Sequence, residues 1–261
     1  FLPPRETMPK AKAAVEQALV IDETLAEAHT SLGCIRAIYE HDWPGSAKEF
    51  QRALALNPNH SMTRYWYGLW YLLLTGQFER CLAETQKALE FDPLSLVINT
   101  GLGWQSYVAG QYDRALAALH QTLEMEKDYV FARDLLGQVY AQKGMYEEAI
   151  AELEKAVALS NRRTLSLGAL GHVYAVAGRM DEAQQILEEL LALAQQKYVS
   201  SYDVALIYAG LAENERALEW LEKAYAEHNC WLGFLNIEPR FHRLRPDPRF
   251  AALLQKVGLY Q

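Results

Sequence analysis

Small and apolar residues recur at helical spacing along most of the chain, most regularly between residues 136 and 157. Three groups mark this stretch, namely an apolar face, a single glycine and a second apolar stripe: Leu136, Gly137 and Tyr140; Gly144; Ala149, Leu153 and Ala156. The two apolar groups follow the period of an α-helix. Gly144 lies between them, where glycine adopts the positive φ of a tight turn at little cost. The pattern predicts a helical hairpin.

The hairpin pattern repeats with a step of 34 residues. One column of small residues in the second helix reads Cys81, Ala115, Ala149, Ala183 and Ala217. Ser46 and Ala11 continue it backwards at steps of 35, as if one residue were inserted around "EHDWPG". Small residues are expected there because helix axes packed about 8–10 Å apart leave little room for side chains. The predicted units are a leading helix at about 8–20 and hairpins at about 24–58, 59–93, 94–127, 128–161, 162–195 and 196–229.

The end of the chain, residues 230–261, departs from the repeat and is predicted to cap it. Asp247 precedes Pro248, which is a good N-cap followed by proline at the first helical position. An apolar stripe then runs through Phe250, Leu253, Leu254 and Val257. We expect a single all-α domain that spans residues 1–261 and ends in a C-terminal capping helix.

The pattern resembles the tetratricopeptide repeat (TPR), a 34-residue helix-turn-helix unit with a Leu-Gly pair, an aromatic residue three positions on, and alanines in its second helix. The resemblance implies that the hairpins stack into a right-handed superhelical solenoid with one continuous core. Segments such as "GMYEEAIAELEKAVALS" and "EPRFHRLRPDPRFAALLQKVGL" are similar to the C-terminal TPR region of bacterial signalling and regulatory proteins. Those regions follow a winged-helix domain, a serine/threonine kinase or a nucleotide cyclase, sometimes with a TolB-like segment, which implies that a chain opening at Phe1 is a fragment.

Charge and cysteine content narrow the classes of function. The net charge of −8 disfavours direct binding to nucleic acid or to anionic membranes, which would repel an acidic surface. The longest apolar run, "YWYGLWYLLL", is about half of a membrane span. Three widely spaced cysteines, Cys34, Cys81 and Cys230, indicate neither a disulfide framework nor a zinc site. These features favour a cytoplasmic protein.

No catalytic motif is present, so we expect neither an enzyme nor a cofactor. His228, Cys230 and His242 come from one irregular stretch without a fourth ligand, which argues against a metal site. A local basic cluster comprises Arg240, Arg243, Arg245 and Arg249. The cluster could receive an anionic partner, but pairing with nearby carboxylates is the simpler expectation.

The concave face of such a solenoid, formed by the first helix of each hairpin, is the expected site of function. The candidate partner-binding residues are Trp66, Trp70, Trp104, Tyr107, Gln138, His172 and Tyr202. The alternative for Trp66 and Trp70 is that they form core between repeats. Two functions stay open: a non-enzymatic scaffold that binds a peptide, a partner protein or another domain of its parent protein, and a sensor domain that binds a small apolar or aromatic ligand and regulates an attached effector.

Overall fold

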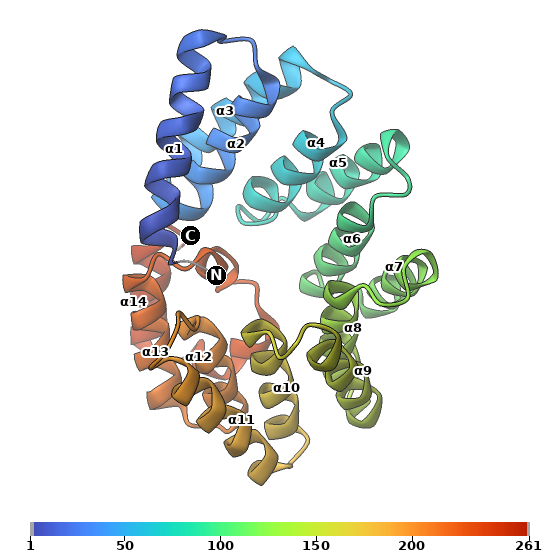
Figure 1. The fold of residues 1–261 in the computed structure, drawn as a ribbon, viewed down its shortest axis with the longest axis vertical. Helices are drawn as coiled ribbons and strands as arrows, with labels where there is room; N and C mark the ends of the chain where they lie inside the picture. Colours follow the sequence, from blue (N-terminus) through green and yellow to red (C-terminus); the bar gives the residue numbers. More distant parts are fainter. Residues whose placement is uncertain (1–2, 260–261) are drawn as a thin grey trace.

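The computed structural model describes residues 3–259, which are helical with no strand in that range. A leading helix, α1 (Pro4–Ile21), precedes six hairpins, and Figure 1 shows the second helix outside the first in those further along the chain, such as α6 with α7 and α8 with α9. The hairpins are α2 (Ala26–Ile35) with α3 (Trp43–Leu56), α4 (Ser61–Tyr67) with α5 (Phe78–Phe91), α6 (Leu96–Val108) with α7 (Tyr112–Met125), α8 (Val130–Gln142) with α9 (Tyr146–Leu159), α10 (Thr164–Val176) with α11 (Met180–Leu193), and α12 (Ser201–Gly210) with α13 (Asn214–Ala226). The predicted all-α solenoid is confirmed.

Close contact between the two helices of a hairpin depends on the glycine column. A Cβ atom on Gly137 would lie 2.9 Å from the carbonyl oxygen of Ala149 and 2.5 Å from Cγ of Leu153. A Cβ atom on Gly103 would lie 2.7 Å from Leu119 in the same way. A side chain at Gly103 would push α6 and α7 apart, and one at Gly137 would push α8 and α9 apart, because the packed interior has no spare volume at these contacts.

The first two hairpins each contain one extra residue, held in a turn of π-helix at the end of the first helix. These turns are η1 (Arg36–Glu40) and η2 (Gly68–Leu72). The amide of Leu73 donates to the carbonyl of Gly68 at 2.9 Å, a span of five residues instead of four. A π-turn absorbs an inserted residue without breaking the helix. The two turns account for the two steps of 35 in the column, since η1 lies between Ala11 and Ser46 and η2 between Ser46 and Cys81.

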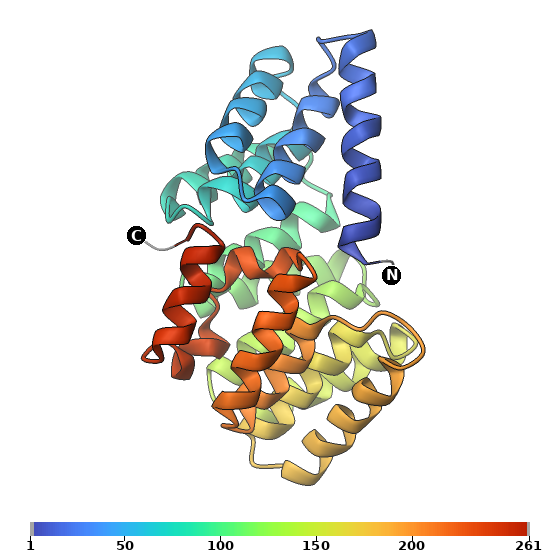
Figure 2. The same cartoon turned by 90° about the vertical axis from the view of Figure 1, so that its left-hand side faces the viewer.

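The superhelix curves so far that its two ends meet. In Figure 1 the chain runs from α1 around the molecule and returns below it with α13 and α14 (Pro248–Lys256). Figure 2 shows the same approach from the side. The rings of Tyr39 and His228 lie 4.7 Å apart, and Nδ1 of His228 lies 3.4 Å from the carbonyl oxygen of Tyr39. The first hairpin therefore contacts the segment that follows the last.

The C-terminal segment consists of two short 3₁₀ helices, η3 (Cys230–Phe234) and η4 (Pro239–Leu244), followed by α14. Asp247 caps α14 as the sequence predicts, because its carboxylate accepts from the amide of Arg249 at 2.8 Å. Phe250 and Leu253 of α14 are buried. Among the described helices, none is both long and apolar enough to cross a membrane.

The turn inside each hairpin needs a left-handed residue, and two of the six turns lack the usual glycine, with His41 in the first hairpin and Ala212 in the last. Gly144 has φ of 76°, and its equivalent in the last hairpin is Ala212 with φ of 61°. We expect Ala212→Gly to stabilise the protein by about 0.5–1 kcal/mol, because it removes the steric cost of an alanine in this region. Urea denaturation measures the change. Ala192→Gly in the exposed last turn of α11 should instead destabilise by up to about 1 kcal/mol; loss of stability in both variants would contradict the argument.

Candidate interaction groove

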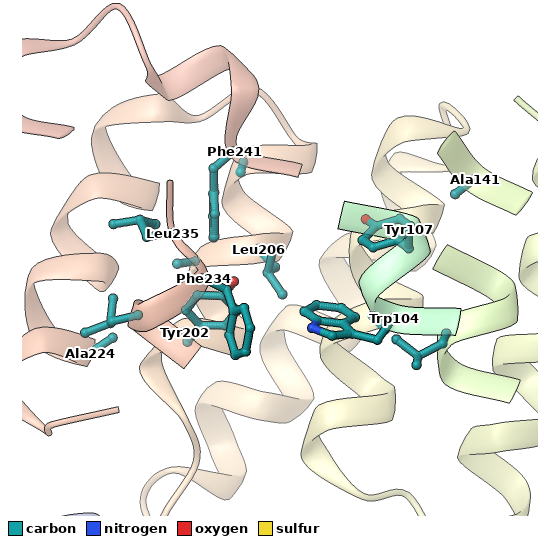
Figure 3. Close-up of a cluster of buried hydrophobic side chains, with 14 of the residues drawn as sticks. Trp104, Tyr107, Ala141, Tyr202, Leu206, Ala224, Phe234, Leu235 and Phe241 are labelled. Carbon is teal, nitrogen blue, oxygen red and sulfur yellow. The ribbon is translucent and has the colours of Figure 1, made fainter. Parts of the chain in front are cut away.

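The first helices of the hairpins line the inside of the ring, which we call the inner groove, and the chain itself fills part of it. Residues 228–244, here called the tail segment, leave α13 and pass through the groove as η3 and η4. Figure 3 shows Phe234 and Phe241 of this segment directed at side chains of the inner groove. The sequence predicts a cap from residue 230 onward, and it gives no sign that this segment lies against the aromatic residues of the groove.

Trp104 is the main contact on the groove side. Its ring lies 5.4 Å from Phe234 and 5.9 Å from Trp231, both at steep angles, and 5.6 Å from Tyr107. Edge-to-face pairs of this kind add stability beyond the area they bury. Trp104 is only 5% exposed. It therefore faces the groove as the sequence predicts, but the tail segment covers it.

A buried ion pair anchors the middle of the tail segment. Arg240 donates through Nε and Nη2 to the two carboxylate oxygens of Glu238, at 2.8 and 2.7 Å. The hydroxyl of Tyr107 donates to the same carboxylate at 3.2 Å. Burial alone would raise the pKa of Glu238, but the charge and hydrogen bonds of Arg240 outweigh it and hold the pKa below its usual range. A buried pair with this geometry fixes the position of the segment more than it adds net stability.

Three further candidate residues lie deeper along the groove. Tyr202 is buried, with its ring 5.4 Å from Phe241. Gln138 is also buried, and its amide nitrogen donates to the carbonyl of Asp134 at 3.1 Å. Nδ1 of His172 lies 2.8 Å from the carbonyl oxygen of Leu206, so this nitrogen carries the proton.

Trp66 and Trp70 lie in a different register from Trp104. Because η2 holds the extra residue, it is Gly68, and not residue 69, that packs against the carbonyl of Cys81, where its Cβ atom would lie 3.3 Å away. A step of 34 residues relates Trp70 to Trp104 and predicts that they occupy equivalent positions, but this prediction is wrong by one position, because Trp104 directly follows Gly103 whereas Trp70 lies two residues after Gly68. Both tryptophans are half-buried and stack on each other at 6.1 Å, and Trp70 still reaches Phe234 at 5.3 Å.

A part of the groove beside the tail segment stays open as a cavity of about 410 Å³. Its floor is made of small residues from α8, α10 and α12, among them Ala141, Ala175 and Ala209, and His172 also lines it. Arg240, His242 and Arg243 of the tail segment form one wall, and none of the lining residues is acidic. Because Glu238 balances the charge of Arg240, Arg243 supplies the positive charge of this cavity, in a chain with a net charge of −8.

Three of the four arginines of the basic cluster have partners within the chain, and the fourth is exposed. Arg249 binds Glu215 and Asp247, and Arg245 donates to the carbonyl of Asn236. Arg240 pairs with Glu238 as described above. Arg243 is exposed and makes no hydrogen bond or ion pair within residues 3–259. Of the four arginines, it is the one left available at the cavity.

Loss of Glu238 should be far more damaging than loss of an exposed carboxylate. Glu238→Ala leaves the guanidinium of Arg240 buried and unpaired, and we expect it to destabilise the protein by about 3–5 kcal/mol. Tyr107→Phe, which removes one hydrogen bond to Glu238, should destabilise by about 1 kcal/mol. Urea unfolding followed by tryptophan fluorescence measures both. The matched control is Glu215→Ala, which removes an exposed partner of Arg249 and should have a much smaller effect; similar losses for Glu215→Ala and Glu238→Ala would refute this account.

His172 should make the stability of the protein depend on pH. Burial, with the charge of Arg240, lowers the pKa of His172 from 6.5 to about 4. The unfolded chain takes up a proton below about pH 6.5 while the folded chain does not. The contribution of His172 is therefore complete above pH 6.5 and is lost as the pH falls towards 4.

We expect the destabilisation caused by His172→Asn to be about 2 kcal/mol larger at pH 7.5 than at pH 4.5. Urea denaturation of both proteins at the two pH values measures this difference, and carboxylates that titrate in the same range cancel in the comparison. An equal destabilisation at the two pH values would show that folding does not lower the pKa of His172.

Comparisons with known proteins agree with this architecture. Residues 108–161 and 141–202 match the family model of the tetratricopeptide repeat. No curated protein sequence matches the chain.

Several solved structures are similar in fold. The crystal structure of PilW, described as a widely conserved type IV pilus biogenesis factor, has a TM-score of 0.60 at 20% identity, over 76% of this chain and 90% of that one. PilF of Pseudomonas aeruginosa has a TM-score of 0.56 at 19% identity, over 74% and 87%. Human IFIT1, in a dimer with PPP-AAAA, has a TM-score of 0.67 at 19% identity, over 97% and 64%. Residues 108–202 therefore match the tetratricopeptide repeat family, and the described chain as a whole has the fold of a TPR solenoid.

Proposed function

We propose that the chain is a non-enzymatic scaffold that binds a segment of a protein partner in its inner groove. Proteins with this repeat bind protein or peptide partners and generally have no catalytic role of their own. The observation that carries the proposal is the tail segment itself. It occupies the groove through aromatic anchors, Trp231, Phe234 and Phe241, in the manner of a peptide bound by a helical repeat.

The open cavity beside the tail segment is the proposed place of first contact. It has small residues on its floor and basic residues on one wall, which suits a peptide that carries an acidic side chain. Of the seven candidate residues, His172 lines this cavity. Four others, Trp70, Trp104, Tyr107 and Tyr202, contact the tail segment directly and would bind a partner only after that segment leaves. Gln138 lies beneath the tail segment, and Trp66 stacks on Trp70.

The wider setting is proposed from the sequence. The tail resembles the ends of bacterial regulatory proteins, which supports a role as the interaction region of a larger signalling or transcription-regulatory protein. Cys34, Cys81 and Cys230 are free, which suits a reducing compartment such as the cytoplasm.

A peptide titration tests the preference for acidic partners. We expect a short fluorescein-labelled peptide that alternates Glu with Leu to bind, and its counterpart with Lys in place of Glu to bind far more weakly. Arg243→Glu should weaken binding of the acidic peptide about fivefold, because a charge at the rim of the cavity is reversed. Fluorescence anisotropy at low ionic strength measures the affinities.

The control is Arg216→Glu, which reverses another exposed charge, on α13 and outside the cavity. Equal binding of the two peptides, or an equal loss in Arg243→Glu and Arg216→Glu, would show that the cavity is not the binding site.

A further inference from the structure

A second cavity, of about 360 Å³, lies apart from the first, where the start of α1 meets the last hairpins. Four parts of the chain supply its walls: the first turns of α1, the starts of α10 and α12, and the beginning of η3. Met8, Leu165 and Trp231 make much of the surface apolar. The volume lies within the range of small-molecule sites in proteins.

One wall holds a buried carboxylate without a partner. Asp203 lines the cavity and is 2% exposed, and its Oδ1 accepts no hydrogen bond from any residue between 3 and 259. Its position is fixed from behind, because a Cβ atom on Gly168 would lie 2.8 Å from Cβ of Asp203. Burial raises the pKa of Asp203 to about 7, although the charges of Arg240 and Arg163 act in the opposite direction. A buried carboxylate of this kind is costly unless something compensates it.

The neighbouring carboxylate of Asp134 is also buried, but hydrogen bonds from the chain compensate one of its oxygens. Asp134 is 1% exposed, and its Oδ2 accepts from Arg163 at 2.6 Å and from Ser166 at 3.1 Å, whereas its Oδ1 has no partner within residues 3–259. Arg163 also lines the cavity and donates through Nη2 to Asp134, while its Nε has no partner within residues 3–259. The cavity therefore combines apolar walls with Arg163, which is paired to Asp134, and with a carboxylate oxygen of Asp203 whose partner the described residues do not provide.

We infer that this cavity binds a small organic amine, with the ammonium group on the Asp203 carboxylate and an apolar or aromatic body against Met8, Leu165 and Trp231. An ammonium group supplies both the hydrogen-bond donors and the positive charge that Asp203 lacks. Trp231 belongs to the tail segment, and Met8 to α1, which has no buried residue of its own. The ligand would therefore join α1 to the tail segment, a role separate from peptide binding in the inner groove.

Phenethylammonium is a suitable probe, with 2-phenylethanol as the neutral analogue and phenylacetate as the anionic one. Isothermal titration calorimetry on the full chain should show binding of the amine, at least tenfold weaker binding of the alcohol, and none of the acid. The affinity for the amine should increase as the pH rises from 5.5 to 8, because Asp203 must be ionised to receive it.

Two variants separate the site from general effects. Asp203→Asn keeps the shape of the side chain and should weaken amine binding at least tenfold, whereas Asp181→Asn, on the surface of α11, should leave it unchanged. Thr7→Phe narrows the cavity from α1 and should also abolish binding without disturbing the hairpins. Circular dichroism checks the fold of each variant. The inference is overturned if the amine does not bind, if the alcohol binds equally well, or if folded Asp203→Asn and Thr7→Phe bind as the unchanged protein does.

Discussion

The close approach of the two helices within each hairpin is the constraint on which the rest of the structure depends. Gly103 and Gly137 allow helix backbones to touch helix side chains at distances that no Cβ atom tolerates. Hairpins built in this way stack one after another, and the turn from each hairpin to the next adds up to a ring (Figure 1). The position of the tail segment inside the ring follows from that curvature, because a flatter array would not bring residue 228 to residue 39.

The polar groups of the groove explain why the tail segment has one position there. Phe234 could pack against Trp104 in several ways, since apolar contacts have little directional preference. The bond from Tyr107 to Glu238 and the two from Arg240 do not have that freedom. Apolar contacts thus supply most of the attraction, whereas the buried polar cluster selects a single register.

The repeat architecture could be predicted from the sequence, because each hairpin depends on contacts between residues fewer than about 20 positions apart, whose spacing is visible in the chain. Gly137 and Ala149 are an example. The inward direction of Trp104 could be predicted for the same reason. That the tail segment covers Trp104 could not be predicted, since Trp231 and Phe234 are more than a hundred residues away in the sequence and their apolar side chains suit any buried surface. The position of Trp70 relative to Trp104 was predicted wrongly, because a π-turn shifts the residues that follow it around the helix axis without changing the composition of the sequence.

The contact between Tyr39 and His228 changes how the protein is expected to respond to force. An open array of repeats behaves as a spring, in which each unit yields with only its neighbours and the whole extends by small amounts at every joint. A ring joined at its ends has no such freedom, because bending one joint must be compensated at another or the junction must break. The molecule is therefore expected to resist extension up to a threshold force and then to open abruptly at the contact between Tyr39 and His228.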